Sequence, residues 1–290
     1  MVDHEILLTK LYNYGIRGIA HAWIKSYLSR RKQYVTFDNK ISTTLDMKYG
    51  VPQGSILGPL LFIIYINDIP NISSSASFVL YADDANIIIS GHSITEIEEK
   101  FNELSMKLET WVNTNGLSIN LKKTNYMIFA NQKLSELPFK PTVCDHEIER
   151  NTDARFLGII INDNLTWNSH ILAIKAKMSR YVGILYKLKK LIPLTARKNI
   201  FYSFVQSHLN YCSLVWGLGP KASIEPLFSE QKKAMRALMP GFNLNYFKDG
   251  LTPCHTKPFF TEYSILTVHS IIFTNILIFM HKHRYFGKCQ

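Results

Sequence analysis

Two adjacent aspartates, Asp83 and Asp84, interrupt an apolar, β-branched run at residues 78–89. The run predicts two short strands joined at the acidic pair, which places both carboxylates at the tip of a hairpin. Like charges side by side repel one another, and a divalent cation turns that repulsion into binding because Mg²⁺ prefers carboxylate oxygens. Taken alone, the pair fits a metal site and a solvated turn equally well.

A second pattern lies upstream, in a loop at residues 50–60 that contains glycine, proline and glutamine and leads into an apolar helix predicted for residues 60–67. Glycines let a backbone approach a ligand closely, and free N–H groups at the start of a helix can contact phosphates or bases. Structural loops share this composition, so the functional interpretation depends on the two patterns occurring together.

Together these patterns resemble the palm of reverse transcriptases, most closely the enzymes encoded by non-LTR (LINE-type, Jockey-like) retrotransposons. Four stretches carry the resemblance by their order and spacing. They are Val-Pro-Gln-Gly-Ser at residues 51–55, Tyr-Ala-Asp-Asp at residues 81–84, the lysine-bearing loop at residues 116–124, and Phe-Leu-Gly-Ile at residues 156–159. The resemblance covers nearly the whole chain and is most specific up to about Ile161.

The resemblance implies an α+β fold in which a partial polymerase palm, an antiparallel sheet with packed helices, spans residues 1–165. A mostly helical thumb-like and C-terminal region would occupy residues 166–290, where the pattern turns helical from Asn168 onward. The implied activity is that of an RNA-directed DNA polymerase that transfers nucleotides to a primer 3′-hydroxyl by a two-metal mechanism. Its partners would be an RNA template, a DNA primer and deoxynucleoside triphosphates, with Mg²⁺ as the cofactor and Mn²⁺ as an alternative.

The resemblance also assigns roles to individual residues. Asp83 and Asp84 would be the catalytic metal ligands. Lys123, or Lys122 beside it, would stabilise charge or act as a general acid at the leaving pyrophosphate, although a solvated lysine pair after a turn fits as well. The substrate-binding residues would line the nascent base pair (Gln53, Gly54), shape the turn at the primer end (Tyr81, Ala82) and hold the primer strand (Phe156, Leu157, Gly158).

Polymerases of this family use a third carboxylate, on a strand just before the segment that resembles residues 2–8. The chain starts at Met1, so that strand and the fingers are expected to be missing and the isolated chain to be inactive. Asp3 precedes Ile6 and Leu7 and is predicted to be a helix N-cap, not a replacement ligand. The alternatives are a catalytically dead nucleic-acid-binding remnant and an interaction protein that uses only its helical half.

Charge supports a nucleic-acid partner. The chain of 290 residues carries a net charge of +11 and has a pI near 9.4, which favours an anionic partner. Two basic stretches that also contain tyrosine, residues 29–34 and 175–190, concentrate this charge. Such segments suit a phosphate backbone, but an ordinary solvated face with tyrosines in the core has the same pattern.

Cysteine usage and the chain ends predict an intracellular protein of the cytoplasm or nucleus. The four cysteines include no C-x-x-C pair, and the Cys and His residues near the C-terminus match no zinc spacing. The first five residues are polar and do not resemble a signal peptide.

The apolar segment at residues 263–280 contains polar side chains that favour a buried helix over a membrane span. The sequence leaves the oligomeric state open.

Local signals predict the main elements. Residues 3–28 predict two helices broken at Gly15 and Gly18, and residues 33–47 predict a hairpin that turns at Asp38-Asn39. A capping box at residues 93–96 predicts the start of a helix that ends at Asn115-Gly116. Residues 125–130 predict a returning strand, and residues 133–146 a loop or hairpin.

Overall fold

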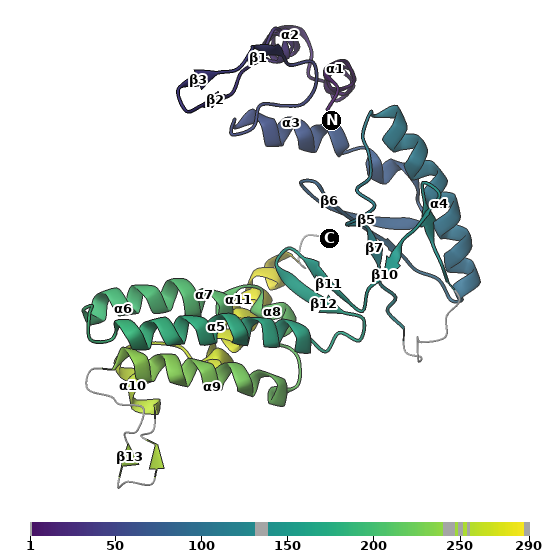
Figure 1. The fold of residues 1–290 in the computed structure, drawn as a ribbon. Helices are drawn as coiled ribbons and strands as arrows, with labels where there is room; N and C mark the ends of the chain where they lie inside the picture. The colour runs from purple at the N-terminus through teal and green to yellow at the C-terminus, as the bar shows by residue number, and fades with distance from the viewer. Residues whose placement is uncertain (1, 131–138, 240–246, 249–251, 254–255, 287–290) are drawn as a thin grey trace. The chain divides into compact units, whose positions relative to one another are not determined.

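The computed structural model describes residues 2–130, 139–239, 247–248, 252–253 and 256–286 (Figure 1). Contacts divide the chain into two compact units: unit 1 is Met1–Tyr126 with Gln132–Arg150, and unit 2 is Met127–Asn131 with Asn151–Gln290. The second boundary falls between Arg150 and Asn151, whereas the sequence predicts the end of the palm near residue 165. The hairpin that follows Arg150 therefore groups with the helical unit.

The described residues of unit 1 form α-helices and short strands. Its helices are α1 (His4–Asn13), α2 (Gly18–Leu28), α3 (Leu57–Ile66), the 3₁₀ helix η1 (Ile69–Ile72) and α4 (Ile94–Thr114). Its strands are β1 (Lys32–Gln33), β2 (Thr36–Phe37), β3 (Lys40–Ile41), β4 (Leu45–Asp46), β5 (Ala76–Tyr81), β6 (Asp84–Ile89), β7 (Asn125–Tyr126), β8 (Thr142–Val143), β9 (His146–Glu147) and β10 (Glu149–Arg150). The mixed helix and strand content confirms the coarse prediction of fold class.

Each strand of unit 1 pairs with a single partner among the described residues. The pairs β1–β4, β2–β3, β5–β6 and β8–β9 are antiparallel, and β7–β10 is parallel. They form separate two-stranded sheets and not the one antiparallel layer that the palm prediction describes. Most of these strands have two residues, which supply too few ladder hydrogen bonds to hold a wider sheet. The strand expected at residues 125–130 is limited to Asn125–Tyr126.

The helix boundaries follow the signals in the sequence. The Asp3 carboxylate accepts hydrogen bonds from the backbone N–H groups of Glu5 (2.9 Å) and Ile6 (3.1 Å), which confirms it as the N-cap of α1. Helix α4 begins after Ser93, as the capping box predicts, and ends at Asn115. Helix α3 begins three residues earlier than predicted, at Leu57.

A buried tyrosine on α3 connects α1 and α4. Tyr65 is fully buried among Leu7, Leu11 and Leu61. Its hydroxyl donates to the Asn115 carbonyl at 2.5 Å and accepts from the Asp3 backbone N–H at 3.3 Å. One side chain thus joins the start of α1 to the end of α4. Burial raises the pKa of the Tyr65 hydroxyl, so it remains a hydrogen-bond donor at neutral pH.

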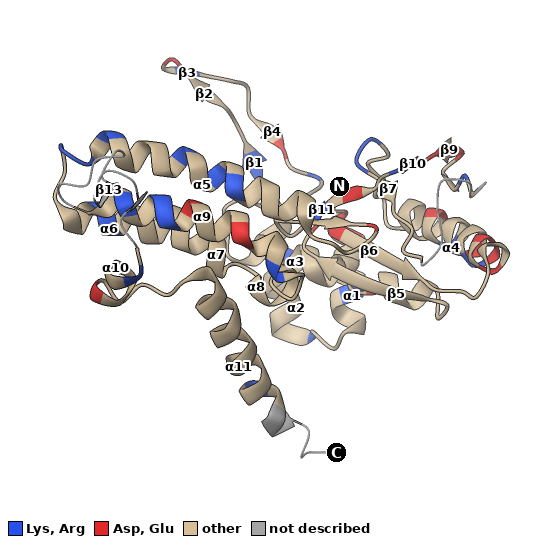
Figure 2. Cartoon of the chain, turned by 90° about the horizontal axis from the view of Figure 1, so that it is seen from below, with Lys and Arg blue, Asp and Glu red and all other residues tan. Residues whose placement is uncertain are grey.

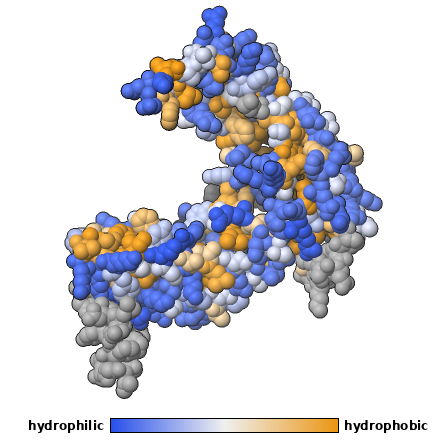
Figure 3. Space-filling view, in the orientation of Figure 1, coloured by the Kyte–Doolittle hydropathy of each residue, from blue (hydrophilic) through white to orange (hydrophobic). Residues whose placement is uncertain are grey.

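The predicted hairpin around Asp38-Asn39 is confirmed as β2–β3. Asp38 and Asn39 have φ of 47° and 57°, the left-handed conformation that a two-residue hairpin turn requires and that Asp and Asn tolerate. The strands carry exposed apolar side chains: Phe37 is 81% and Ile41 69% exposed, and hydrophobic surface is visible at this hairpin in Figure 3.

Unit 2 is mostly helical, as predicted from Asn168 onward. Its helices are α5 (Asn168–Leu188), α6 (Leu194–Phe201), the π-helical turn η3 (Tyr202–Gln206), α7 (Ser207–Asn210), α8 (Ser213–Trp216), α9 (Lys221–Leu238), α10 (Lys257–Glu262) and α11 (Val268–Phe286). Its strands are β11 (Asp153–Phe156), β12 (Ile159–Asn162), β13 (Phe247–Lys248) and β14 (Thr252–Pro253). Both strand pairs are antiparallel.

The core of unit 2 lies between α5 and α9, which pack side by side. Met178, Leu185 and Met235 are fully buried there. Gln231 on α9 is also fully buried, and its amide donates to the Leu266 carbonyl and accepts from the Val268 N–H, both at 2.9 Å. The predicted basic residues of α5 follow the helix as a row of Lys and Arg (Figure 2).

The apolar C-terminal segment forms α11. Ile271 and Ile272 are buried against the other helices, whereas Phe273 and Leu277 are 61% and 50% exposed. Within the described residues, no helix combines the length and the apolar character that crossing a bilayer demands.

We expect Tyr65→Phe to lower the free energy of unfolding by about 1–3 kcal/mol, because the buried Asn115 carbonyl and Asp3 N–H lose their shared partner. Chemical denaturation of the chain measures this loss. Tyr14→Phe is the matched control, since Tyr14 is 47% exposed. Equal stability of the two variants would show that the Tyr65 hydroxyl does not join α1 to α4.

Candidate active site

The acidic pair lies at the tip of hairpin β5–β6, as predicted. The ladder runs from Ala76 opposite Ile89 to Tyr81 opposite Asp84, so Ala82 and Asp83 form the two-residue link. Ala82 has a φ of 49°, a left-handed conformation that residues other than glycine adopt infrequently. A tight turn with this backbone presents two consecutive carboxylates at one end of a twisted ribbon.

The tip is open to solvent. Tyr81, Ala82, Asp83 and Asp84 are all exposed, whereas Phe78 farther down the strand is partly buried. Two adjacent carboxylates of this kind supply hard oxygen donors, which suit Mg²⁺ or Mn²⁺. In the part of the chain that the structure describes, no group of three or more His, Cys, Asp or Glu side chains lies close enough together to hold a metal ion.

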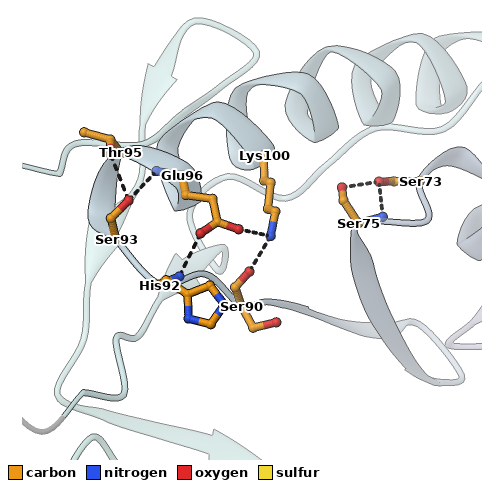
Figure 4. Close-up of polar contacts among 8 residues, drawn as sticks. All are labelled: Ser73, Ser75, Ser90, His92, Ser93, Thr95, Glu96 and Lys100. Atoms are coloured by element: carbon orange, nitrogen blue, oxygen red, sulfur yellow. Dashed lines mark hydrogen bonds and ion pairs between the residues drawn. The ribbon is translucent and has the colours of Figure 1, made fainter.

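The base of the hairpin is tied to α4. Lys100 donates to the Ser90 carbonyl at 2.8 Å, just after β6 ends, and pairs with Glu96 at 2.7 Å (Figure 4). Glu96 in turn accepts from the His92 N–H at 2.8 Å, and its own N–H donates to Ser93 Oγ at 3.2 Å. The hydrogen bond from Lys100 lowers the pKa of the Glu96 carboxyl. These contacts fix the strand that leads away from Asp84.

The loop that carries Gln53 and Gly54 is closed on itself by a serine. Ser55 Oγ donates to the Pro52 carbonyl at 2.8 Å and accepts from the Gly58 N–H at 2.9 Å, at the start of α3. Gly54 has a φ of 78°, and a Cβ on Gly58 would lie 2.6 Å from the Pro52 carbonyl oxygen. Both glycines are therefore required by the backbone. Gln53 and Gly54 themselves are exposed.

The same loop is attached to the N-terminal segment. The Gly50 N–H donates to the Val2 carbonyl, and His4 Nε2 lies at hydrogen-bonding distance from the Gly50 carbonyl, each at 2.7 Å. The Asp3 carboxylate is already used as the cap of α1. Its contacts are therefore structural, in agreement with its predicted role.

Lys123 follows the glycine turn at the end of α4. Gly116 has a φ of 59°, and a second turn brings the Thr124 hydroxyl to the Asn120 carbonyl at 3.0 Å. Lys122 and Lys123 are both exposed. Within the described residues, no hydrogen bond or ion pair joins Lys123 or the Gln53 loop to the hairpin tip. The structure thus groups Tyr81, Ala82, Asp83 and Asp84, and leaves their relation to Lys123 and Gln53 a prediction.

Phe156, Leu157 and Gly158 belong to unit 2, at the turn of hairpin β11–β12. Leu157 and Gly158 have φ of 46° and 83°. The Tyr211 hydroxyl donates to the Leu157 carbonyl at 2.6 Å, and a Cβ on Gly158 would lie 3.5 Å from the Tyr211 ring. Trp216 Nε1 donates to the Tyr211 carbonyl at 2.9 Å. Tyr211 therefore holds this turn, a role that local sequence patterns could not assign because 54 residues separate the partners.

The same hairpin is joined to α5 through a buried histidine. His170 Nδ1 accepts from the Ile160 N–H at 3.3 Å. Burial lowers the pKa of His170, with smaller contributions from Lys177 and Arg155. Because the Ile160 N–H requires an unprotonated Nδ1, the neutral imidazole is the form that fits the fold.

Comparison with known proteins settles the family. The sequence profile described as "Reverse transcriptase (RNA-dependent DNA polymerase)" matches residues 1–161, which is more than half of the 290 residues. The chain belongs to the reverse transcriptase family. The matched region includes the hairpin with Asp83 and Asp84, the Gln53 loop, Lys123 and the Phe156 turn.

The similar proteins come from mobile elements of insects. In Drosophila melanogaster, the probable RNA-directed DNA polymerase from transposon X-element is 25% identical over 223 residues, and that from transposon BS is 28% identical over 225. The RNA-directed DNA polymerase from mobile element jockey of the same species is 26% identical over 226. These matches confirm the resemblance to Jockey-like, non-LTR elements. Each covers 74% of this chain, which spans about a quarter of the relatives' length.

We expect the free energy of unfolding of unit 2 to fall as the pH drops below the ordinary histidine pKa of 6.5. The pKa of His170 is lowered in the fold, so the unfolded chain takes up the proton first and gains stability. The free energy of unfolding stops falling once the pH is below the lowered pKa of His170 in the folded chain. Denaturation followed by tryptophan fluorescence at several pH values measures this dependence.

His170→Asn is the informative variant, because an amide oxygen can still accept from the Ile160 N–H but does not titrate. Its stability should change less with pH than that of the wild-type chain. Some dependence should remain, since burial also lowers the pKa of His208. An unchanged pH dependence in His170→Asn would contradict the assignment.

Proposed function

We propose that this chain is part of the polymerase domain of a retrotransposon RNA-directed DNA polymerase, which transfers nucleotides to a primer 3′-hydroxyl, and that the isolated chain is inactive without a third carboxylate. The observation that carries the proposal is the Tyr81–Asp84 tip, two exposed consecutive carboxylates on a tight hairpin turn, in a chain of the reverse transcriptase family. The proposed substrates are an RNA template, a DNA primer and deoxynucleoside triphosphates. Because these substrates are intracellular, we place the activity in the cytoplasm or the nucleus.

Asp83 and Asp84 would hold Mg²⁺, or Mn²⁺ in its place, through carboxylate oxygens. When bound, such ions polarise the α-phosphate and lower the pKa of the attacking hydroxyl. Around them, the chain's own residues position the substrates. Ala82 and Tyr81 shape the turn that faces the primer end, and the anchored base of the hairpin at Lys100 keeps the tip in one geometry.

The other predicted residues would bind the remaining parts of the substrates. Gln53 and Gly54, on a loop closed by Ser55, would line the nascent base pair. Lys123 would neutralise charge on the leaving pyrophosphate. In unit 2, the turn of Phe156, Leu157 and Gly158, held by Tyr211, would support the primer strand. Each of these roles follows from the family's motifs and remains a proposal for this chain.

A second candidate function is nucleic-acid binding without chemistry. The net charge of +11 supports binding to a polyanion whether or not nucleotides are joined. A hybrid-binding chain that does not extend a primer even when the third carboxylate is supplied would support this candidate and not the first. Salt-dependent binding of an RNA/DNA hybrid is common to both, so extension is the discriminating measurement.

Under the first proposal, we expect extension of a DNA primer on an RNA template, with Mg²⁺ or Mn²⁺, when the third carboxylate that the family uses is supplied together with this chain. We expect none from the isolated chain, because its described residues bring no third ligand to the tip. The double variant Asp83→Asn, Asp84→Asn should lose extension by on the order of a hundredfold or more, because amides hold the ions too weakly to stabilise the developing charge. Primer extension assays resolved on denaturing gels measure the loss.

The control is Asp145→Asn, at the turn of hairpin β8–β9. Asp145 is exposed and has a φ of 60°, a conformation that Asn tolerates. Its extension should equal that of the wild-type chain. Wild-type extension that survives loss of both tip carboxylates would contradict their assignment as metal ligands.

A further inference from the structure

Helix α2 and the turn after it form a basic segment free of acidic residues. Between Glu5 and Asp38 the sequence contains no Asp or Glu and six cations: Lys10, Arg17, Lys25, Arg30, Arg31 and Lys32. Lys10 is paired with Asp68 at 2.7 Å, and Lys32 lies 3.9 Å from Asp46. Within the described residues, no carboxylate pairs with Arg17, Lys25, Arg30 or Arg31. The segment therefore presents positive charge that its own unit does not neutralise.

Three side chains at a spacing of four residues form a stack along α2 and its end. The rings of Trp23 and Tyr27 lie 5.9 Å apart with an angle of 12° between their planes. The Arg31 guanidinium carbon lies 5.1 Å from the centroid of the Tyr27 ring. Helical positions i and i+4 lie on the same face, which accounts for the pairing of Trp23 with Tyr27. Arg31 lies beyond the end of α2 at Leu28, so the turn after the helix brings its guanidinium to the Tyr27 ring. We name Trp23, Tyr27 and Arg31 the α2 ladder.

The ladder is accessible at its Trp23 end. Trp23 is 57% exposed, while Tyr27 is partly buried against the core of unit 1 and fixes the ladder in place. Trp23 also borders an apolar depression of about 580 Å³ between α2 and α3, together with Ile19 and Leu60. An exposed indole, held flat against a second ring, is an ordered surface for another planar group.

The turn after α2 adds a further cation, Arg30, directly before Arg31. Arg30 has a φ of 55° directly after the cap residue Ser29. Helix ends commonly place glycine in this left-handed position, because a side chain there is strained.

We propose that the α2 ladder binds single-stranded nucleic acid, with a base stacked on Trp23 and the adjacent phosphates contacted by Arg30 and Arg31. A planar aromatic face beside unpaired cations is the chemistry that single strands recognise without regard to sequence. The absence of carboxylates between Glu5 and Asp38 favours a polyanion over a protein helix in the depression. The inference rests on the proposed function in one respect, namely that the substrate includes a nucleic-acid strand. It adds to the β5–β6 tip a second surface at which this chain would contact that strand.

Fluorescence anisotropy with the whole chain tests the proposal, using labelled oligo(U) and oligo(dT) of about 20 nucleotides and a blunt DNA duplex of the same length. We expect Trp23→Ala to weaken binding to both single strands by about tenfold and to leave duplex binding within about twofold. Arg31→Lys keeps the charge but loses the planar guanidinium, so it should weaken single-strand binding by a smaller factor. Circular dichroism confirms that each variant is folded.

Ile19→Ala is the matched control, because Ile19 is 91% exposed and borders the same depression but has no ring. It should bind single strands as the wild-type chain does. Unchanged binding in Trp23→Ala, or an equal loss in Ile19→Ala and Trp23→Ala, would overturn the proposal. The double variant Asp83→Asn, Asp84→Asn should retain single-strand binding. A wrong polymerase assignment would therefore appear in the primer extension assay, and a wrong assignment of the α2 ladder would appear in the single-strand binding assay.

Discussion

The buried hydroxyl of Tyr65 is the interaction on which the arrangement of unit 1 depends. It joins the start of α1, at Asp3, to the end of α4, at Asn115. The Gly50 loop is attached to that start through Val2 and His4, and the base of the β5–β6 hairpin is attached to α4 through Lys100. The loop with Gln53 and the tip with Asp83 are thus both supported by helices that one fully buried side chain connects.

The sequence predicts the features of this fold that depend on local chemistry. The turn at Asp83, the cap at Asp3 and the left-handed pair Asp38-Asn39 each follow from residues within a few positions of one another. The contacts of Tyr65 and Tyr211 span 50 residues or more, so no local pattern specifies them. The β11–β12 hairpin groups with unit 2 because its Ile160 N–H donates to the buried His170 of α5, a contact that no pattern near residue 150 indicates. The Lys100–Glu96 pair was detectable from its spacing of four residues.

The candidate site is a tight hairpin turn whose side chains are exposed to solvent. Asp83 and Asp84 lie at the tip of a hairpin whose base is attached to α4, and both residues are exposed. The pair lies within the residues that match the reverse transcriptase family. We propose further substrate contacts at the α2 ladder in unit 1 and at the turn held by Tyr211 in unit 2. A long polyanionic substrate suits contacts that are distributed in this way.

The central claim is that Asp83 and Asp84 bind a divalent ion, and Mn²⁺ titration followed by NMR tests it most directly. Bound Mn²⁺ broadens the amide signals of nearby residues. We predict selective broadening at Tyr81 and Asp84 in the wild-type chain, with loss of the effect in the double variant Asp83→Asn, Asp84→Asn. The signals of Asp145, at another hairpin turn, should remain sharp in both. Equal broadening at both turns, or none at the β5–β6 tip, would contradict the account.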